Sequence, residues 1–275
     1  MTGVSTERKR IVFVTHYNPD LDGCVAIWLL KKFGFPQAEH IIKFVPMGGK
    51  LPCEEVRNGD EVIYVDTSGG KYDHHETEEY VSSASMAMKE VAPTNDVAIE
   101  RMVDYALAVD HGKVLNTDVS TFDLVNIIEG LNRVQHREPG VVVDIVICCL
   151  DGIYRSLTEL IEAERELEKA VFFTTRWGKG AGAVTSNRKT RYLAHRQGIK
   201  VFVYVDEVSG YRGFTASGDS PVDFSVLAER IRGLEPEADW YLHTSRRLLL
   251  CGSGKAPNRK LSSMPLERMI DLVKV

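Results

Sequence analysis

Three short segments in the first part of the 275-residue chain concentrate side chains that bind metal ions and transfer protons. Their members are His16, Asp20 and Asp22 in HYNPDLD, then Asp66, then Asp73, His74 and His75. Carboxylates packed within about 4–6 Å raise one another's pKa unless a cation neutralises them. Carboxylate and imidazole ligands without thiolate suit Mn²⁺, and less selectively Mg²⁺, Co²⁺, Fe²⁺ or Zn²⁺. Two such ions about 3.5–4 Å apart activate a water molecule and stabilise phosphoryl oxygens in an in-line displacement.

Predicted β-strands precede the first two segments. Short apolar runs rich in β-branched residues predict strands over residues 11–15, 41–46 and 62–66. Helical patterns follow over residues 22–33, 82–91, 96–109 and 124–132. Alternation of strand and helix predicts a parallel sheet with helices on its faces. Ligands gather beyond the carboxyl ends of such strands, so we expect the three segments to converge there.

Each segment alone has an ordinary structural explanation. His16 could be a hydrogen-bonded core histidine, and His74 with His75 could be a surface pair. Pro19 is expected to keep Asp20 and Asp22 out of a regular helix, so that both carboxylates turn to one side. The occurrence of all three segments in order, each at the mouth of one predicted sheet, favours a metal site.

HYNPDLD, the VDT that contains Asp66, and DHH resemble the motifs of the DHH phosphoesterase superfamily. Its members include RecJ-type exonucleases, oligoribonucleases, cyclic dinucleotide phosphodiesterases and manganese-dependent family II pyrophosphatases. The motifs cover residues 16–75, and the resemblance implies a metal-binding catalytic domain over residues 1–150. It implies that one ion is held by His16, Asp20 and Asp66. It implies that the second is held by Asp22, Asp66 and His74, with Asp66 bridging.

The resemblance also implies catalytic roles for two further residues. His75 would face the substrate phosphate as electrophile or proton donor, and Asp73 would orient the histidine pair. A fourth family motif supplies another aspartate to the second ion. Asp110 is the preferred candidate because it ends a predicted helix and is followed closely by Gly112. Asp104 is the alternative, although it lies inside the predicted helix.

The rest of the chain predicts a connector and a smaller α/β domain. A long amphipathic helix is expected over residues 153–171, and RWGKGAG at 176–182 reads as a loop, so residues 151–182 form the predicted connector. The second domain is expected over residues 183–275. Its predicted strands are 200–205, 213–216, 240–243 and 248–251, and its predicted helices are 222–232 and 265–273.

A glycine-rich basic segment near the C-terminus, LLLCGSGKAPNRK at 248–260, is loosely similar to the GGGH-type loop of phosphodiesterase members. Its glycines are partly present, its histidine is absent, and a lysine lies in the same loop. Backbone N–H groups of glycine-rich turns bind anions, and a nearby lysine adds charge. The expected substrate-binding residues are Gly252, Ser253, Gly254, Lys255, Arg246 and Arg247.

Charge and composition narrow the class of protein. Residues 1–178 hold 18 basic and 29 acidic residues, whereas residues 179–275 hold 16 and 10, within a net charge of −5. Apolar runs of about ten residues or fewer are too short for a membrane span, and the N-terminus is not that of a signal peptide. Five cysteines without a CxxC pair favour a reducing compartment, so a cytoplasmic location is expected.

The motifs together predict a divalent-metal-dependent phosphoesterase that acts on a nucleotide or short oligonucleotide. We expect no membrane and no long double-stranded nucleic acid as partner, and a homodimer stays open. A manganese-dependent inorganic pyrophosphatase is the alternative enzyme, because HxNPDxD is close to that branch and NRKTR at 187–191 faintly matches its basic motif. An alternative of another class is a non-catalytic sensor that binds metal and nucleotide.

Overall fold

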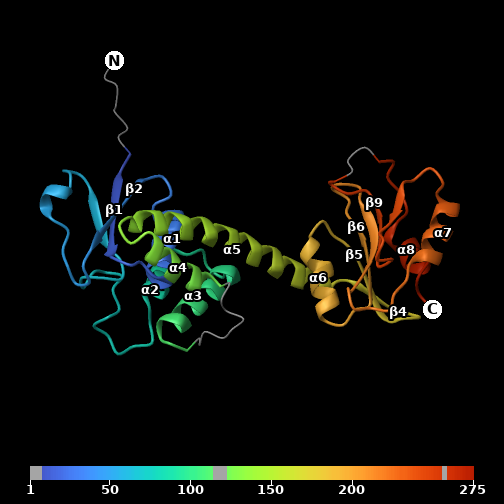
Figure 1. Ribbon diagram of the computed structural model, residues 1–275, viewed down its shortest axis with the longest axis horizontal. Coiled ribbons are helices and arrows are strands. Elements are labelled where there is room, and N and C mark those ends of the chain that lie inside the picture. The colour runs from blue at the N-terminus through green and yellow to red at the C-terminus, as the bar shows by residue number, and fades with distance from the viewer. Residues whose placement is uncertain (1–7, 114–122, 256–258) are drawn as a thin grey trace, which may run out of the picture. The chain divides into compact units, whose positions relative to one another are not determined.

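The computed structural model describes residues 8–113, 123–255 and 259–275, and the chain divides into two compact units between Leu157 and Thr158 (Figure 1). The first unit thus ends beyond residue 150, where the first domain was expected to end. The reason is that residues 139–168 form one continuous 30-residue helix, α5 (Pro139–Glu168). Its residues Tyr154 and Leu157 still pack against the core of the first unit, so helical packing continues past the expected boundary.

The first unit contains the predicted parallel sheet. Strand β1 (Arg10–His16) lies between β2 (Glu39–Val45) and β3 (Glu61–Tyr64), and both neighbours run parallel to it. A short 3₁₀ turn, η2 (Cys53–Glu55), separates β2 from β3. The other helical elements of this unit are α1 (Leu21–Leu29), the π-helical turn η1 (Leu30–Gly34), α2 (Ser83–Val91), α3 (Val97–Asp110) and α4 (Leu124–Val134). Helix α1 is buried on all sides, as its sequence, apolar nearly all round, predicts.

Side chains at the helix N-termini decide where these helices begin. The Gly23 N–H donates to Asp20 Oδ1 over 3.0 Å, so Asp20 is the N-cap of α1. The expectation that Asp22 stays out of a helix is wrong, because this cap places Asp22 in the first turn of α1. The predicted cap of α3 is confirmed, since Asp96 accepts from the Ala98 and Ile99 N–H groups.

The second unit is built on a six-stranded mixed sheet in the order β4-β5-β6-β7-β9-β8. Its strands are β4 (Val171–Thr175), β5 (Gly178–Val184), β6 (Val201–Val205), β7 (Arg212–Ala216), β8 (Trp240–Leu242) and β9 (Leu248–Cys251). Its helices are α6 (Arg188–Arg196), α7 (Ser225–Leu234) and α8 (Leu266–Asp271), besides the end of α5. Among the described residues, no helix is long and apolar enough to cross a membrane.

The glycine-rich RWGKGAG segment, predicted to be a loop, instead forms part of this sheet. Strands β4 and β5 pair as an antiparallel hairpin, and β5 then pairs in parallel with β6. A Cβ atom on Gly182 would lie 2.8 Å from the Ile270 side chain, and one on Gly180 would overlap the Phe173 ring. These glycines therefore permit close packing on the strand, which composition alone does not distinguish from a flexible loop.

Candidate metal centre

The carboxyl ends of β1 and β3 meet the start of α1, as the parallel sheet requires. His16 is the last residue of β1, and its Nε2 lies 3.2 Å from Asp66 Oδ2 and 3.9 Å from Asp20 Oδ2. His16 and Asp66 are buried, and their ligand atoms with that of Asp20 all lie within 4.8 Å of one another. One imidazole and two carboxylates thus converge on a single point.

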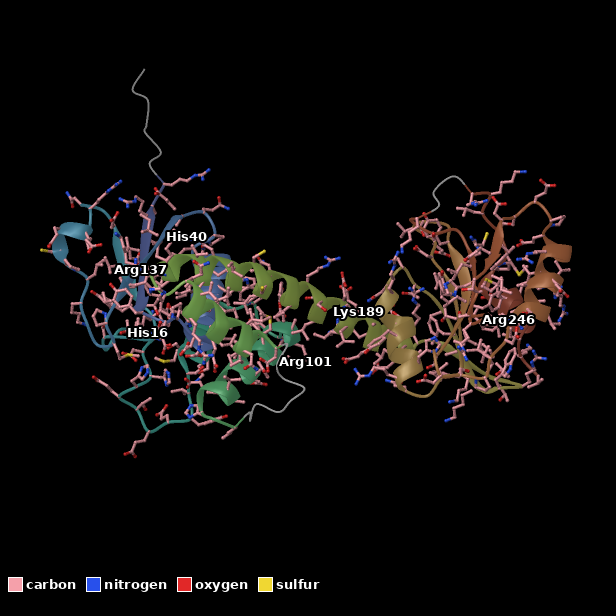
Figure 2. The ribbon with its side chains drawn as sticks, viewed as in Figure 1. His16, His40, Arg101, Arg137, Lys189 and Arg246 are labelled. Atoms are coloured by element: carbon pink, nitrogen blue, oxygen red, sulfur yellow. The ribbon has the colours of Figure 1, made fainter. Side chains whose placement is uncertain are left out.

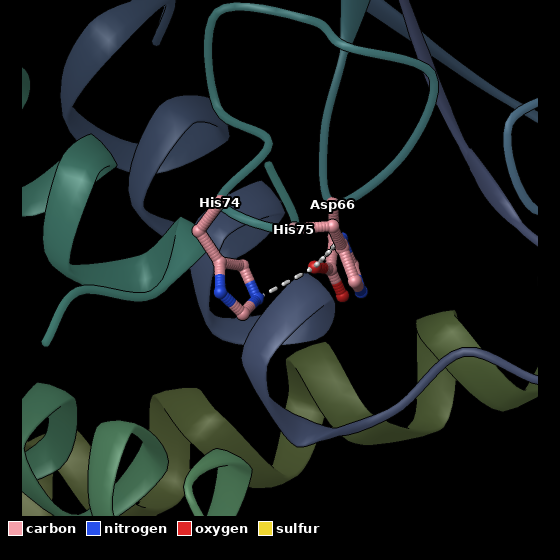
Figure 3. A group of neighbouring side chains, drawn as sticks. All are labelled: Asp66, His74 and His75. Atoms are coloured by element: carbon pink, nitrogen blue, oxygen red, sulfur yellow. Dashed lines mark ion pairs between the residues drawn. The ribbon is translucent and has the colours of Figure 1, made fainter. Parts of the chain in front are cut away.

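A second group surrounds His74. Its Nε2 lies 3.3 Å from Asp66 Oδ1, a contact that Figure 3 draws as a dashed line. The same nitrogen lies 3.6 Å from Asp110 Oδ2 and 3.8 Å from Asp22 Oδ2. This Nε2 is buried, and within the described part of the chain it has no hydrogen-bond partner of good geometry. For ligand bonds of about 2.1 Å, neighbouring ligand atoms around an octahedral ion lie about 3 Å apart. The separations here are slightly larger, so the donors and their spacing fit a divalent cation.

Asp66 lies between the two groups, with Oδ2 toward His16 and Oδ1 toward His74. Its backbone is left-handed, with φ of 57°, and its N–H donates to the Tyr72 carbonyl over 2.8 Å. Such a conformation is uncommon outside glycine and is retained where the surroundings require it. A Cβ atom at Gly23 would lie 3.2 Å from Asp66 Oδ2, so this glycine lets α1 approach the carboxylate. The geometry suits a bridging ligand.

The first turn of α2 holds two of the carboxylates in place. The Ser83 and Ala84 N–H groups donate to Asp22 Oδ2 and Oδ1 over 2.7 and 3.0 Å. The Ser83 hydroxyl donates to Asp66 Oδ1 over 3.0 Å. The sequence analysis did not assign Ser83 to the site. Its only signal in the sequence is its position at the start of a predicted helix after the histidine pair.

Asp73 contacts His75 rather than His74. Its Oδ1 accepts from His75 Nδ1 over 2.6 Å, and its Oδ2 accepts from the Gly69 N–H over 2.7 Å. His75 is 44% exposed, and its Nδ1 lies 3.9 Å from Asp66 Oδ1. Burial raises the pKa of Asp73, but the hydrogen bond with His75 outweighs it and lowers that pKa. An ionised Asp73 fixes the Nδ1–H tautomer of His75 and leaves Nε2 for a ligand.

Mutual repulsion and burial perturb the titration of the cluster. Burial lowers the pKa of His16, but contact with Asp66 outweighs it and raises that pKa to about 9. Contact with Asp66, against opposing burial, raises the pKa of His74 to about 9 as well. Burial would raise the pKa of Asp66, yet the two histidines hold it well below its usual range.

The other carboxylates shift in the opposite direction. Burial and then the Asp66 charge raise the pKa of Asp22 to about 6. The same two causes raise the pKa of Asp20, although its side chain is 52% exposed and water offsets part of the shift. Protons on the histidines therefore neutralise the cluster where cations otherwise would.

Asp110, rather than Asp104, joins this cluster. Asp110 is the last residue of α3, whereas Asp104 is exposed in the middle of the same helix. The next residue, His111, donates through Nε2–H to the Val81 carbonyl over 2.9 Å. This bond connects the end of α3 to the segment that leads into α2. It therefore links the helix that carries Asp110 to the helix whose first turn binds Asp22.

The glycine-rich segment lines a groove of about 1170 Å³ within the second unit, whereas two arginines expected there do not. Gly252, Ser253, Gly254 and Lys255 are lining residues; residues 256–258 lie outside the described part of the chain. Arg246, labelled in Figure 2, pairs with Asp223 over 3.1 Å. Arg247 donates to the Ser220 carbonyl over 2.7 Å. The sequence did not reveal these local partners of Arg246 and Arg247, which were both expected to bind substrate.

Other cationic and aromatic side chains line the groove instead. The arginines are Arg188, Arg191, Arg232 and Arg259, and the aromatic residues include Tyr204, Tyr211, Trp240 and Tyr241. The NRKTR segment supplies the first two arginines from α6, which Asn187 caps. The others come from β6, α7, β8, the connection between β6 and β7, and the segment after β9, which only the folded sheet brings together. Arginines beside aromatic rings suit phosphate and nucleobase binding.

Fold and site define an α/β protein with a carboxylate–histidine centre whose residues can hold divalent metal ions. No family model matches the chain, and no curated protein matches it. Among solved structures, the chain is similar to one described as the crystal structure of exonuclease RecJ bound to manganese. The two are 14% identical with a TM-score of 0.30, over 90% of this chain and 86% of that chain.

Proposed function

We propose that this chain is a divalent-metal-dependent phosphohydrolase of the DHH superfamily that cleaves a phosphoester bond of a nucleotide or short oligonucleotide. The observation that carries the proposal is the buried His74 Nε2, which faces three carboxylates without a well-aligned hydrogen bond among the described residues. A cation would satisfy this nitrogen and the surrounding carboxylates together.

The ligands divide into two sets that share Asp66. His16 and Asp20 would hold one ion, and Asp22, His74 and Asp110 would hold the other. Two divalent ions bound there supply a nucleophilic water at neutral pH and positive charge for the phosphoryl oxygens. Mn²⁺ is the preferred ion for this donor set, with Mg²⁺ and Co²⁺ as alternatives. The Ser83 hydroxyl orients the carboxylate of Asp66, which is the ligand common to both sets.

His75 supplies the proton chemistry in this proposal. Its Nδ1 is engaged by Asp73 over 2.6 Å, so its Nε2 is the atom that binds the phosphoryl oxygen or protonates the leaving group. The pairing resembles the carboxylate–imidazole arrangement that fixes ring orientation and tautomer elsewhere. Its partial exposure allows a substrate to reach the ring.

The residues that line the groove of the second unit favour a nucleotide over an inorganic substrate. Arginines bind phosphate oxygens in a bidentate manner, and aromatic rings stack on bases. Inorganic pyrophosphate has no flat apolar group for such rings to bind. We therefore assign the groove to the binding of phosphate and base groups of nucleotides.

The test is a hydrolysis panel after metal stripping and Mn²⁺ addition. It contains di- to pentanucleotides, a cyclic dinucleotide, a 3′,5′-bisphosphonucleotide and pyrophosphate. Asp66→Asn is the informative variant because it keeps the shape of the carboxylate but removes its charge. Asp104→Asn is the matched control, since this aspartate is exposed on α3 and lies outside the cluster. We expect phosphodiester turnover that Asp66→Asn abolishes and Asp104→Asn retains.

Other outcomes assign other functions. Turnover of pyrophosphate alone would identify an inorganic pyrophosphatase. Tight Mn²⁺-dependent nucleotide binding without any turnover would identify a non-catalytic sensor. Equal turnover by the wild-type protein and Asp66→Asn would contradict the proposed centre.

A further inference from the structure

Two large apolar side chains are exposed beside the candidate metal ligands. Tyr17 is 52% exposed and Met47 is 56% exposed. Tyr17 follows the end of β1, and Met47 lies two residues after the end of the adjacent strand β2. The Tyr17 N–H donates to the Val45 carbonyl over 3.0 Å, which continues the pairing of the two strands past His16. The two residues therefore lie at neighbouring strand ends.

Tyr17 is hydrogen-bonded to the candidate ligand His16, and Met47 is hydrogen-bonded to Thr67, the residue after Asp66. His16 Nδ1–H donates to the Tyr17 carbonyl over 2.8 Å, which leaves Nε2 for the metal site. The hydroxyl of Thr67, next to Asp66, donates weakly to Met47 Sδ over 3.8 Å. The Gly48 N–H donates to the same hydroxyl over 3.2 Å. Tyr17 and Met47 thus border the His16 side of the centre.

The Tyr17 ring has an aromatic neighbour on β2. Its backbone is bonded on both sides, and its ring lies 6.4 Å from that of Phe44 at an interplanar angle of 24°. The ring is thus backed on one side by Phe44, and half of its surface is in contact with water. A rigid aromatic ring loses little side-chain entropy when it binds a partner, and methionine adapts to the shape of that partner.

We propose that Tyr17 and Met47 form a subsite for the nucleobase of the nucleotide whose phosphate is bound at the adjacent centre. This inference rests on the proposed function and deepens it, because it names a base-bearing phosphoester as substrate. The pair carries no positive charge for a free phosphate, and inorganic pyrophosphate has no flat apolar group to stack on the Tyr17 ring. A purine or pyrimidine stacks on the exposed part of the Tyr17 ring and contacts the Met47 thioether.

The experiment compares two substrates with the same phosphodiester in the Mn²⁺-loaded full-length protein. One is the dinucleotide pApA, and the other is its abasic analogue with tetrahydrofuran residues in place of the nucleosides. Stacking on an aromatic side chain corresponds to about a 5- to 150-fold effect per base. We expect Tyr17→Ala to raise KM for pApA within this range with kcat little changed, and to leave the abasic analogue unaffected.

Three controls separate stacking from loss of structure. Tyr17→Phe keeps the ring, so it should retain the wild-type KM. Met47→Ala should raise KM for pApA by less than Tyr17→Ala does. Tyr105→Ala removes another exposed tyrosine, on α3, and should change neither substrate. An equal loss on both substrates would overturn the proposal, because Tyr17 would then act only by positioning His16. An unchanged KM for pApA would overturn it as well.

A binding measurement keeps this inference separate from the proposed hydrolase activity. The probe is 2-aminopurine riboside 5′-monophosphate with Mg²⁺, whose fluorescence is quenched on stacking. Quenching that Tyr17→Ala removes, without turnover of any ester, would support the subsite and refute the hydrolase. Turnover of pApA with quenching unchanged in Tyr17→Ala would support the hydrolase and refute the subsite.

Discussion

Loading the metal-free protein with divalent ions should release protons from the ligand histidines. His16 and His74 each have a pKa raised to about 9 in the metal-free cluster. At pH 7 a group with that pKa is about 99% protonated, and a protonated imidazole cannot donate its lone pair to a metal. Each ion should therefore displace about one histidine proton, and two ions about two. Asp22, with a pKa of about 6, adds about a tenth of a proton at this pH, and Asp20, whose pKa burial raises to about 7, adds about half a proton.

The measurement is isothermal titration calorimetry of Mn²⁺ into metal-free protein at pH 7, in buffers with different ionisation enthalpies. The slope of the observed enthalpy against buffer ionisation enthalpy gives the number of protons released. The affinity for each ion should rise about tenfold per pH unit between about pH 7 and 9 and then level off, because one proton is lost per ion. His74→Gln should bind one ion and release one proton fewer.

His136→Gln is the matched control, because His136 is exposed in the turn between α4 and α5 and lies outside the cluster. It should keep both the stoichiometry and the proton count. Release of fewer than about half a proton per ion, or an affinity that does not change with pH, would refute the assignment of these imidazoles as ligands.

The raised pKa values of His16 and His74 also determine how the free energy of unfolding of the metal-free protein changes with pH. A histidine whose pKa is higher in the folded state stabilises the fold below its unfolded pKa of about 6.5, and loses this contribution as pH rises to about 9. The free energy of unfolding of the metal-free protein should therefore fall over this range. Urea denaturation at several pH values measures it, and the Mn²⁺-loaded protein should show a smaller fall.

Three further predictions concern Ser83 at the metal centre, Gly252, and the groove of the second unit. Ser83→Ala removes the hydroxyl that orients Asp66 and should weaken Mn²⁺ binding about 10- to 100-fold in calorimetry; Ser85→Ala, which perturbs the α2 cap without touching Asp66, should bind Mn²⁺ normally. Gly252→Ala combines a φ of 86° with a Cβ 2.6 Å from the Leu261 side chain and overlapping the ring of Tyr211, so its thermal midpoint should fall by several degrees; an unchanged midpoint would contradict this. Arg188→Ala should weaken oligonucleotide binding in fluorescence anisotropy, whereas Arg246→Ala, outside the groove, should not; equal losses would refute the groove assignment.

Local sequence patterns predicted the elements that carry the centre. The apolar strands, the cap of α3 and the order of the three motifs follow from short-range periodicity and hydrogen-bonding preferences. Parallel pairing of β1 with β2 and β3 then places His16 and Asp66 at one edge of the sheet. A chain with these patterns has few other arrangements available, so the convergence of the motifs could be expected from the sequence.

Contacts between distant segments were not predictable in the same way. The sequence favoured Asp110 over Asp104, but the contact of Asp110 with His74 depends on where α3 ends in space. The role of Ser83 depends on how α2 packs against α1. The glycines of β5 looked like a loop because their close packing against Phe173 and Ile270 involves residues on other elements.

The sequence by itself determined the kind of side chains at the centre and the strand ends from which they come. Tertiary structure alone decided which oxygen of Asp66 faces which histidine, and which arginines line the groove of the second unit. The physical reason is that side-chain type and local period act over a few residues, whereas ligand geometry depends on the packing of helices and strands that are far apart in the chain.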